Sequence, residues 1–314
     1  MSRLSTLKRL WRTNKREIFP AIYNYIVHLG VTNGLSDETY LKITYRIKIG
    51  NKLNLEKPET FNEKIQWLKI HDRNPIYTTM VDKVEVKKYI SDKIGEKYII
   101  PTLGVWEEFS QIDWEALPER FILKCSHDSG SVVICEDKKN FDITKAGKKL
   151  KKKLSKNAFY WGREWPYKDV KPRIIAEEYL SENANELKDY KFMCFNGKVK
   201  CSFVTSERFS ESGLKVTFFD RDWNVMPFER HYPKSEKKIE CPQKYDEMVR
   251  LAEILSEGIP FVRVDFYEVN GNIYFGELTF SPGCGFEEFT PQKWDSILGS
   301  WITLPVQKEA AKYM

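Results

Sequence analysis

The sequence contains no apolar run long enough to cross a membrane. A membrane-spanning helix needs about 18 consecutive apolar residues, and the apolar stretches in these 314 residues are only a few residues long. Residues 1–17 also lack the unbroken apolar core and the small-residue cleavage site of a secretory signal. We therefore expect an intracellular, cytoplasmic protein.

Paired cysteines and clustered histidines are also missing. No two of the six cysteines form a C-x-x-C pair, which argues against a zinc ribbon and against a small disulfide-bonded fold. The four histidines show no spacing typical of metal ligands. We expect reduced, buried thiols and no zinc or iron site.

Excess charge of one sign is small. The chain carries 51 Lys and Arg against 45 Asp and Glu, a net charge of +6, with 31% charged and 41% hydrophobic residues. This balance is that of a globular protein whose length suggests roughly two domains with a cleft between them. Because the charge is modest and no nucleic-acid motif occurs, we expect no nucleic-acid partner.

The amino-terminal segment, residues 1–48, mixes basic and apolar side chains at loosely helical spacing. One interpretation is an amphipathic helix on an anionic membrane surface. The other is a helix packed on its own domain, with a solvated basic face. The residues are Arg3, Lys8, Arg9, Arg12, Lys15 and Arg16, with the apolar Leu4, Leu7, Leu10, Trp11, Ile18, Ile22, Tyr25 and Ile26.

Helical and extended patterns occur together along the rest of the chain. Capping and periodicity predict helices over 60–70, 81–94, 142–155 and 245–255. β-rich runs predict strands over 121–126, 131–135, 173–180, 190–195, 198–204 and 215–219. Asn-Gly pairs predict two hairpins, one turning at 196–197 and one joining 261–269 to 273–279 through 270–271. Hairpins grouped with helices favour an α+β fold over a doubly wound parallel sheet.

The second hairpin carries the clearest chemical pattern. Arg263 and Asp265 lie two apart and share one face of the first strand, and Glu277 and Thr279 share a face of its partner. A turn at 270–271 brings the two carboxylates together across the ladder, where a divalent cation, Mg²⁺ or Mn²⁺, offsets their repulsion. The alternative is an exposed carboxylate pair on a solvated face.

A lysine inside an apolar strand forms a second pattern. Lys124 lies in the run FILKCS, and the polar turn 127–131 leads into the next strand. Flexible Ser/Gly backbone can direct its N–H groups at phosphate oxygens while a lysine supplies charge. Further acidic and basic residues follow at Glu177, Glu178, Asp189 and Lys191. Each of these features taken alone is also typical of a solvated surface.

The order of these patterns resembles the ATP-grasp superfamily of carboxylate–amine ligases. From about Phe61 to Thr290 the chain is similar to the TupA-like family, which occurs with teichuronopeptide and other bacterial surface-polysaccharide genes. The phrases that carry the resemblance are FNEKIQWLKIHDRNP, VDKVEVKKYI, LKCSHDSGSVVIC, GREWPYKDVKPRIIAEEYL, DYKFMCFNGKVK and FVRVDFYEVNGNIYFGELTFSPGCGFEEFTP.

The resemblance implies an ATP-grasp fold, in which two α+β subdomains clasp ATP. The expected divisions are a basic helical segment over 1–48 and a helical region over 49–118. A small subdomain with the lysine strand follows over 119–180, and a metal-binding subdomain over 181–314.

The resemblance also assigns the phosphate contacts. Lys83 and Lys124 would contact ATP oxygens, and the turn Ser129-Gly130-Ser131 would close over the phosphates.

Base and ribose contacts follow in the same way. Glu177 would accept a hydrogen bond from the adenine amino group, with the backbone at Tyr179 and Leu180 beside the ring edge. Asp189 would bind the ribose hydroxyls, and Lys191 is a further nucleotide-binding residue.

The resemblance assigns the contacts with the metal and with the reacting carbonyl to the second hairpin. Asp265 and Glu277 would hold one or two Mg²⁺ (or Mn²⁺), and Arg263 would face the developing oxyanion. Where this chain has Thr279 the superfamily usually has Asn, which places the second metal position in question.

The implied reaction is ATP-dependent amide formation through an acyl phosphate. The implied substrates are an amino acid and a sugar acid, free or lipid-linked, in the synthesis of capsule, exopolysaccharide or teichuronopeptide. Contact with the inner face of the cell membrane would come through the amino-terminal segment. Aromatic side chains at Tyr160, Trp161, Trp165 and Tyr167 suit either sugar stacking or packing.

A glycosyltransferase of the same pathway is the alternative function. Asp220 and Asp222 form a D-x-D directly after a predicted strand, and such a pair can bind Mn²⁺ and a nucleotide-sugar diphosphate. The same pattern is equally natural in a surface turn.

Overall fold

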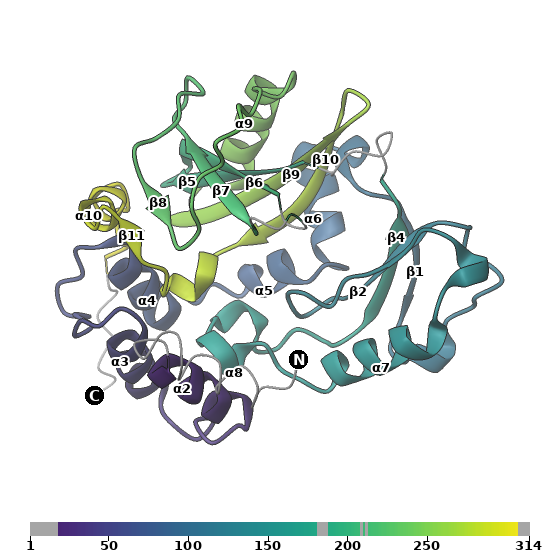
Figure 1. Ribbon diagram of the computed structural model, residues 1–314, viewed down its shortest axis with the longest axis horizontal. Coiled ribbons are helices and arrows are strands. Elements are labelled where there is room, and N and C mark those ends of the chain that lie inside the picture. Colours follow the sequence, from purple (N-terminus) through teal and green to yellow (C-terminus); the bar gives the residue numbers. More distant parts are fainter. Residues whose placement is uncertain (1–17, 181–187, 208–209, 211–212, 307–314) are drawn as a thin grey trace, which may run out of the picture.

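The computed structural model describes residues 18–180, 188–207, 210 and 213–306 and contains two antiparallel sheets with helices packed on them (Figure 1). The five-stranded sheet occupies the upper part of the view and the four-stranded sheet its right side. The expected α+β class is confirmed. Residues 1–17, which carry most of the basic side chains of the amino-terminal segment, lie outside the described residues.

The four-stranded sheet has the order β1-β4-β2-β3 and is antiparallel throughout. Side chains of β2 alternate, so Phe121 and Leu123 are buried with Leu150 of α7 while Lys124 points to the other face. Because β1 precedes residue 119 and pairs with β4, this sheet draws on two of the expected divisions. The elements are β1 (Thr102–Trp106), β2 (Phe121–Cys125), β3 (Val133–Cys135), β4 (Ile174–Glu178) and α7 (Ile143–Leu154).

The five-stranded sheet has the order β10-β9-β5-β6-β7. Both expected hairpins are present: β5 and β6 join at 196–197, and β9 and β10 at 270–271. Asn196 and Asn270 have positive φ, as does the glycine after each, which is the backbone that a tight hairpin turn requires. The strands are β5 (Asp189–Phe195), β6 (Lys198–Ser206), β7 (Lys215–Phe219), β9 (Phe261–Val269) and β10 (Asn272–Thr279).

Each face of the five-stranded sheet carries its own core. On one face Phe192, Val264 and Phe266 pack with α9 (Tyr245–Leu255) and α6 (Val86–Ile94). On the other, Phe195 and Phe261 pack against Phe61 at the start of α4 (Phe61–His71), beside α10 (Lys293–Ser300). Thr60 and Glu63 form a capping box at the start of α4, as its sequence predicts.

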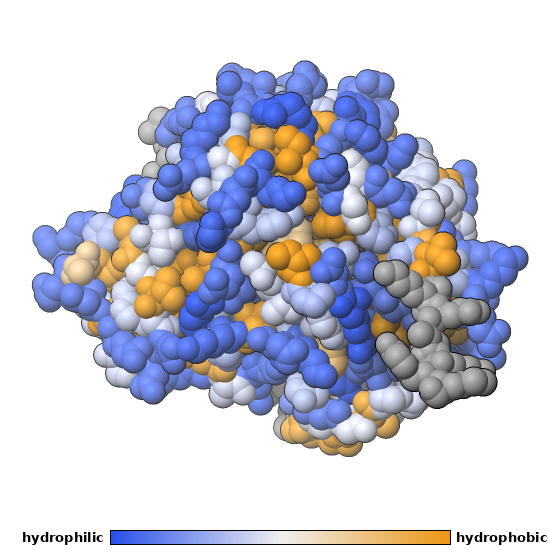
Figure 2. All heavy atoms as spheres, turned by 180° about the vertical axis from the view of Figure 1, so that it is seen from behind, coloured by the Kyte–Doolittle hydropathy of each residue, from blue (hydrophilic) through white to orange (hydrophobic). Residues whose placement is uncertain are grey.

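The first two described helices are α2 (Ile18–His28) and α3 (Asp37–Lys48). They pack together in a separate small core that includes Tyr23 and Val27 of α2 and Leu41 of α3. Figure 2, which shows the molecule from behind, has hydrophobic residues at its lower edge, where Figure 1 places α2. The described part of the chain has no helix long and apolar enough to cross a membrane.

The remaining elements are short and connect the larger ones. They are α5 (Ile76–Val81), α8 (Phe159–Gly162), the strands β8 (Glu229–Arg230) and β11 (Phe289–Thr290), and the 3-10 turns η2 (Glu96–Tyr98), η3 (Phe109–Gln111), η4 (Lys138–Asn140), η5 (Trp165–Tyr167) and η6 (Pro282–Gly285).

Two sequence predictions are wrong. The helix expected over 81–94 is interrupted, because α5 ends at Val81 and α6 begins at Val86. Asp82 leaves the helix there, accepts a hydrogen bond from the Val84 N–H at 2.9 Å and pairs with Arg173 at 2.6 Å. The second error concerns the thiols: four cysteines are buried, whereas Cys241 is exposed and Cys284 is half-buried.

Candidate active site

Strand β2 presents Lys124 on the face of the four-stranded sheet that lies away from α7. Glu177 of β4 is its diagonal neighbour, because Lys124 pairs with Ile175 in the register. Lys124 Nζ lies 2.6 Å from one oxygen of Glu177, and Lys87 Nζ lies 2.6 Å from the other. Burial alone would raise the pKa of Glu177, but the two ammonium groups lower it. The carboxylate therefore stays ionised and fixes both lysines.

Lys83 joins this group from the connection between α5 and α6. Its ammonium donates to the backbone carbonyl of Asp128, and its backbone N–H donates to Ser126 at 3.2 Å. Burial lowers the pKa of Lys83, while the carboxylates of Glu277 and Asp128 act in the opposite direction. Lys83 is thus held against the turn that follows β2.

One residue of that turn is already used in hydrogen bonding within the protein, and two are exposed. The Ser131 hydroxyl accepts the Cys125 N–H at 2.7 Å and is buried. Ser129 and Gly130 are exposed at the tip, and Gly130 has φ +84°, which favours glycine. Ser129 and Gly130 are therefore the parts of the expected phosphate turn that are open to a ligand.

The two carboxylates of the second hairpin meet as the sequence predicts. Asp265 and Glu277 are directly opposite in the register, after a bulge at Gly276. A Cβ on Gly276 would lie 3.2 Å from the Asp265 carbonyl oxygen, so glycine permits this close approach. Arg263 Nη2 donates to both carboxylates at 2.6 Å, and the Thr279 hydroxyl lies 3.3 Å from Glu277.

Charges alternate across this face of the sheet. Lys191 of β5 is opposite Asp265 and pairs with it at 2.5 Å, and it also contacts Asp189. Burial is the largest influence on Asp265 and raises its pKa to about 6. Burial has the same tendency at Glu277, but Arg263 and the nearby lysines lower the pKa of that residue to about 2.

The residues present fit a magnesium ion. Across the described ranges no three His, Cys, Asp or Glu side chains gather as metal ligands. Asp265 and Glu277 nevertheless offer carboxylate oxygens side by side, with the Thr279 hydroxyl near them. Mg²⁺ is usually bound in this way, through one or two carboxylates that leave room for phosphate oxygens and water.

The residues expected to contact the adenine base lie at the end of β4 and just after it. The Tyr179 hydroxyl donates to Glu136 at 2.9 Å, and the Arg120 guanidinium lies 4.1 Å from the centre of the Tyr179 ring. Leu180 is the last described residue before residue 188. The adenine roles of Glu177, Tyr179 and Leu180 and the ribose role of Asp189 stay predictions, although one buried oxygen of Asp189 has no hydrogen-bond partner in the described structure.

Three residues near the site, Lys87, Glu164 and Lys69, were not assigned a role from the sequence. Lys87 is four residues after Lys83, a helical spacing that could have indicated it. Glu164 accepts a hydrogen bond from the Cys284 thiol at 3.2 Å, in the loop that follows Thr279. Lys69 donates to the carbonyls of Gly162 and Cys284, each at 2.7 Å, and so ties the same two segments together.

The aromatic residues of this region divide into two groups. Trp161 packs against His28 and Lys153, and Tyr160 packs against Phe159, so these rings belong to the protein core or its rim. Tyr167 is half-buried, and the charges of Glu164, Glu277 and Arg263 influence its pKa, which burial raises.

The D-x-D residues lie at the opposite edge of the five-stranded sheet. Asp220 follows β7, the outer strand on the far side from β10. Its carboxylate accepts the N–H groups of Asp222 at 2.9 Å and Asn224 at 2.8 Å, which closes the turn. In the structure the two aspartates thus form a surface turn, which is the second of the two interpretations of this motif.

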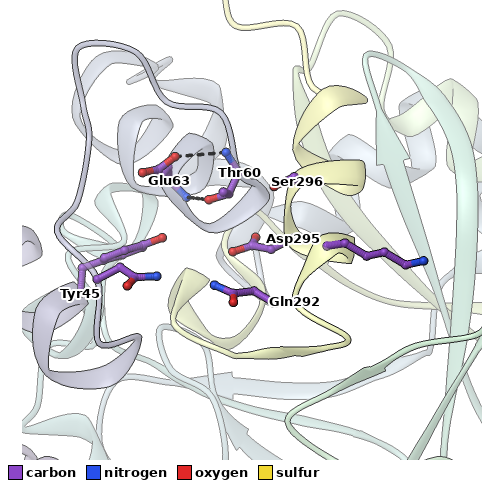
Figure 3. Close-up of a pocket in the computed structure, with 8 residues that line it drawn as sticks. Tyr45, Thr60, Glu63, Gln292, Asp295 and Ser296 are labelled. Carbon is purple, nitrogen blue, oxygen red and sulfur yellow. Dashed lines mark hydrogen bonds between the residues drawn. The ribbon is translucent and has the colours of Figure 1, made fainter.

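A pocket of about 290 Å³ lies elsewhere, between α4 and α10 (Figure 3). Three of its polar lining residues are already paired: Glu63 and Thr60 cap α4, and Asp295 accepts the Asn62 N–H at 2.9 Å. The pocket shares no residue with the lysine and carboxylate group.

Comparison with known proteins gives one sequence match and several structural likenesses. The family model for TupA-like ATP-grasp proteins matches residues 63–303, about three quarters of the chain. No curated protein matches.

The structural likenesses are to ligases and are distant. The ATP-grasp ligase PsnB, complexed with a minimal precursor, is 12% identical with a TM-score of 0.38, over 80% of this chain and 67% of that one. D-alanine–D-alanine ligase from Helicobacter pylori is 12% identical with a TM-score of 0.40, over 77% and 69%. The Bacillus anthracis enzyme is 17% identical with a TM-score of 0.35, over 64% and 57%. The chain thus spans 57% to 69% of these three solved chains.

Proposed function

Because the chain belongs to the TupA-like ATP-grasp family and is therefore an ATP-dependent ligase of that fold, we propose that it joins a carboxylate to an amine through an acyl phosphate. The observation that carries the proposal is the approach of two charge groups. Lys83 is held to the turn after β2. The helix that ends two residues before it, α5, packs on the end of β10, because the ring centres of Tyr77 and Phe280 lie 4.3 Å apart. The Glu277 carboxylate of β10 accordingly acts to raise the pKa of Lys83, against the effect of burial. Phosphates between the two groups would have lysines on one side and a carboxylate-bound cation on the other, the arrangement that phosphoryl transfer needs.

In the first half of the proposed reaction, a substrate carboxylate oxygen attacks the γ-phosphorus of ATP. The bond from that phosphorus to ADP breaks, which leaves an acyl phosphate and ADP. Lys83 and Lys124 reduce the negative charge of the phosphates so that an anionic carboxylate can approach. Asp265 and Glu277 would hold Mg²⁺, which adds to this neutralisation when bound.

In the second half, the substrate ammonium first gives up one proton, and the amine nitrogen then attacks the acyl carbon. The bond from that carbon to the phosphate oxygen breaks, phosphate leaves, and the nitrogen loses a second proton, which the departing phosphate can take, as the amide forms. Arg263 donates to both carboxylates, and its guanidinium is the cation that we propose to stabilise the oxyanion.

Glu164 and Tyr167 are the residues proposed to receive the amine. Burial raises the pKa of Glu164 and the nearby Lys69 ammonium lowers it, while its carboxylate accepts a hydrogen bond from the Cys284 thiol. Since Lys69 donates to backbone carbonyls and not to this carboxylate, the ammonium group of an amine substrate would supply a second, directly bonded cation. Arg263 and Glu277 influence the pKa of both residues, which supports an amine position beside the reacting carbonyl.

For the substrates we propose a sugar acid and an amino acid of a bacterial surface polysaccharide. The support is the sequence resemblance to the TupA-like family over 61–290. The saccharide would be a small molecule or lipid-linked, and ATP with Mg²⁺ or Mn²⁺ would complete the reaction mixture.

Calorimetry tests the nucleotide first. We expect saturable binding of a non-hydrolysable ATP analogue with Mg²⁺, and at least about tenfold weaker binding in Lys124→Ala. Lys88→Ala is the matched control, because Lys88 is exposed and pairs with Asp92 on its own helix. Binding of a UDP-sugar without ATP binding, lost in Asp222→Asn, would contradict the ligase and favour the glycosyltransferase.

An activity screen then tests the substrates. Pairs of uronic acids and amino acids are screened for ADP release and for an amide product by mass spectrometry. ADP release that needs both substrates supports the proposal, whereas release that needs only a sugar phosphate or water would contradict it.

A further inference from the structure

Helix α7 is joined to the turn after β2 by two of its lysines. Lys149 donates to the Val132 carbonyl at 2.6 Å, and Lys153 donates to the Ser129 carbonyl at 3.4 Å. The helix lies below β2 in Figure 1, on the face of the four-stranded sheet that packs against Leu150. The position of the turn is therefore coupled to the position of α7.

The side chain of Asp128, in the same turn, is buried. It is 6% exposed, and neither of its carboxylate oxygens has a hydrogen-bond partner in the described ranges. Lys153 forms an ion pair with it, with Nζ 3.2 Å from Oδ2. A buried carboxylate without hydrogen bonds is strongly destabilised unless a cation lies beside it. We therefore expect the ionised form of Asp128 to depend on Lys153.

A second cation lies at the backbone of Asp128. The Lys83 ammonium donates to the Asp128 carbonyl. Burial lowers the pKa of Lys83, and the carboxylates of Glu277 and Asp128 act against this effect. If Lys153 were removed, the unpaired Asp128 carboxylate would attract the Lys83 ammonium, because a buried charge is costly without a partner. A lysine paired with a carboxylate has less of its charge to offer to a phosphate.

Lys153 is itself held in place by another segment of the chain. Its ammonium lies 5.2 Å from the ring centre of Trp161 in α8, and the Trp161 ring packs edge-on against His28, with ring centres 4.8 Å apart. A cation over an indole ring is stabilised by the electrons of the ring face. The Lys153 side chain is only 25% exposed, whereas Lys152, on another face of α7, is exposed. Lys153 thus differs from its neighbour in having a fixed position.

We propose that Asp128 and Lys153 are positioning residues for ATP, in which Lys153 neutralises the buried carboxylate and so keeps Lys83 available for the phosphates. This inference rests on the nucleotide site of the proposed function, and it adds two residues that act through Lys83 and the turn without touching the ligand. The same pair holds the turn at Ser129 and Gly130, whose exposed tip is the part open to a phosphate.

Calorimetry of the full chain with a non-hydrolysable ATP analogue and Mg²⁺ tests the proposal. We expect Lys153→Met to weaken binding at least about tenfold, because Lys83 is then drawn to the carboxylate. Lys153→Arg retains a cation beside Asp128 and should bind within about threefold of wild type. Lys152→Met is the matched control and should leave the affinity unchanged, since it removes a lysine from the same turn of the helix that has no contact with Asp128.

A double variant separates positioning from direct contact with the phosphates. Asp128→Asn removes the charge that Lys153 neutralises, so in that background Lys153→Met should change the affinity by less than about threefold. The double variant should also bind more tightly than Lys153→Met alone. This comparison contains no unpaired buried carboxylate, and it therefore decides the question even if Lys153→Met alone does not fold.

Three results would overturn the proposal. The first is unchanged affinity in Lys153→Met, and the second is a Lys153→Arg variant that binds as weakly as Lys153→Met. The third is a tenfold loss when Lys153→Met is added to Asp128→Asn, because Lys153 would then contact the phosphates itself. Failure of the wild-type chain to bind the analogue would contradict the proposed function, and this inference with it.

Discussion

Opposed carboxylates on neighbouring strands repel each other, and Arg263 holds Asp265 and Glu277 together by donating to both. Without the arginine, the two carboxylates would repel each other and move apart. Because this pairing needs ionised carboxylate oxygens, an amide substitution at either position weakens it.

Asp265→Asn and Glu277→Gln should each reduce kcat at least about 100-fold, because each loses charge stabilisation worth roughly 3 kcal/mol in the transition state. ADP release under saturating substrates measures the effect. Asp220→Asn and Asp222→Asn are the controls and should retain activity within about twofold. The reverse pattern would refute the assignment of the site.

Lys87 should act through Glu177 as a positioning residue. Lys87→Ala should weaken ATP binding less than Lys124→Ala does, since Lys87 Nζ contacts Glu177 and the Ile100 carbonyl. Titration calorimetry of both variants gives the comparison, with kcat measured alongside. Equal or larger loss of affinity in Lys87→Ala would instead place Lys87 at the phosphates.

Lys69 should give the protein a distinct pH dependence of stability. Burial lowers its pKa from 10.5 to about 8. Above pH 8 the native state gives up this proton while the unfolded state keeps it, so the Lys69 contribution to the free energy of unfolding rises with pH up to about 10.5.

Lys69→Met should remove that contribution, which amounts to about 2 kcal/mol between pH 7.5 and pH 9.5. Urea unfolding of both proteins at the two pH values, with thiols kept reduced, gives the difference. Tyrosine and cysteine titrations are common to both proteins and cancel. Identical pH dependence in the two would show that Lys69 is protonated throughout.

At the scale of elements, the sequence predicts what short-range chemistry decides. Both Asn-Gly hairpins, the capping box at Thr60 and α9 occur where their patterns place them. The expected helix over 81–94 failed because Asp82 pairs with Arg173, a residue 91 positions away. β1 was not predicted, since Thr102–Trp106 contains Gly104 and is stabilised by pairing with β4.

Helix α10 should depend on a glycine at its contact with α4. A Cβ at Gly299 would lie 2.2 Å from the Glu59 carbonyl oxygen, a backbone atom that cannot move aside easily. Gly299→Ala should therefore lower the free energy of unfolding by about 2 kcal/mol or more. Gly34→Ala is the control, because no atom lies within 4 Å of a Cβ there.

Thermal unfolding of the two glycine variants gives the comparison. A melting temperature of Gly299→Ala equal to that of Gly34→Ala would contradict the close packing of α10 on the start of α4.

For the whole molecule, the sequence indicated the charged residues of the candidate site more completely than the contacts that they make. Lys124, Asp265 and Glu277 stood out because a charge inside a strand is visible in a linear pattern. Lys87 and Glu164 did not, because their importance comes from chain segments that are distant in sequence. Lys87 meets Glu177, and Glu164 meets Cys284, only in the folded chain.

Magnesium ATP should stabilise the whole molecule, since it would contact both sheets. At 100 times its Kd the ligand adds about 2.7 kcal/mol, which raises Tm by a few degrees. Scanning fluorimetry should show the shift in wild type, a smaller shift in Lys124→Ala and in Asp265→Asn, and none with UDP-glucose. A full shift in both variants would place the nucleotide elsewhere.

The contact between α4 and α10 brings together segments that a ribosome produces far apart in time. Asn62 donates to Asp295, so the core around Phe61 is completed only when nearly all of the described chain has been made. The four-stranded sheet needs nothing beyond Glu178. During synthesis the four-stranded sheet, which carries Lys124, can therefore form early. The five-stranded sheet, which carries Asp265 and Glu277, keeps an apolar face exposed until α10 has been made. We therefore expect nascent chains stopped before α10 to need chaperones.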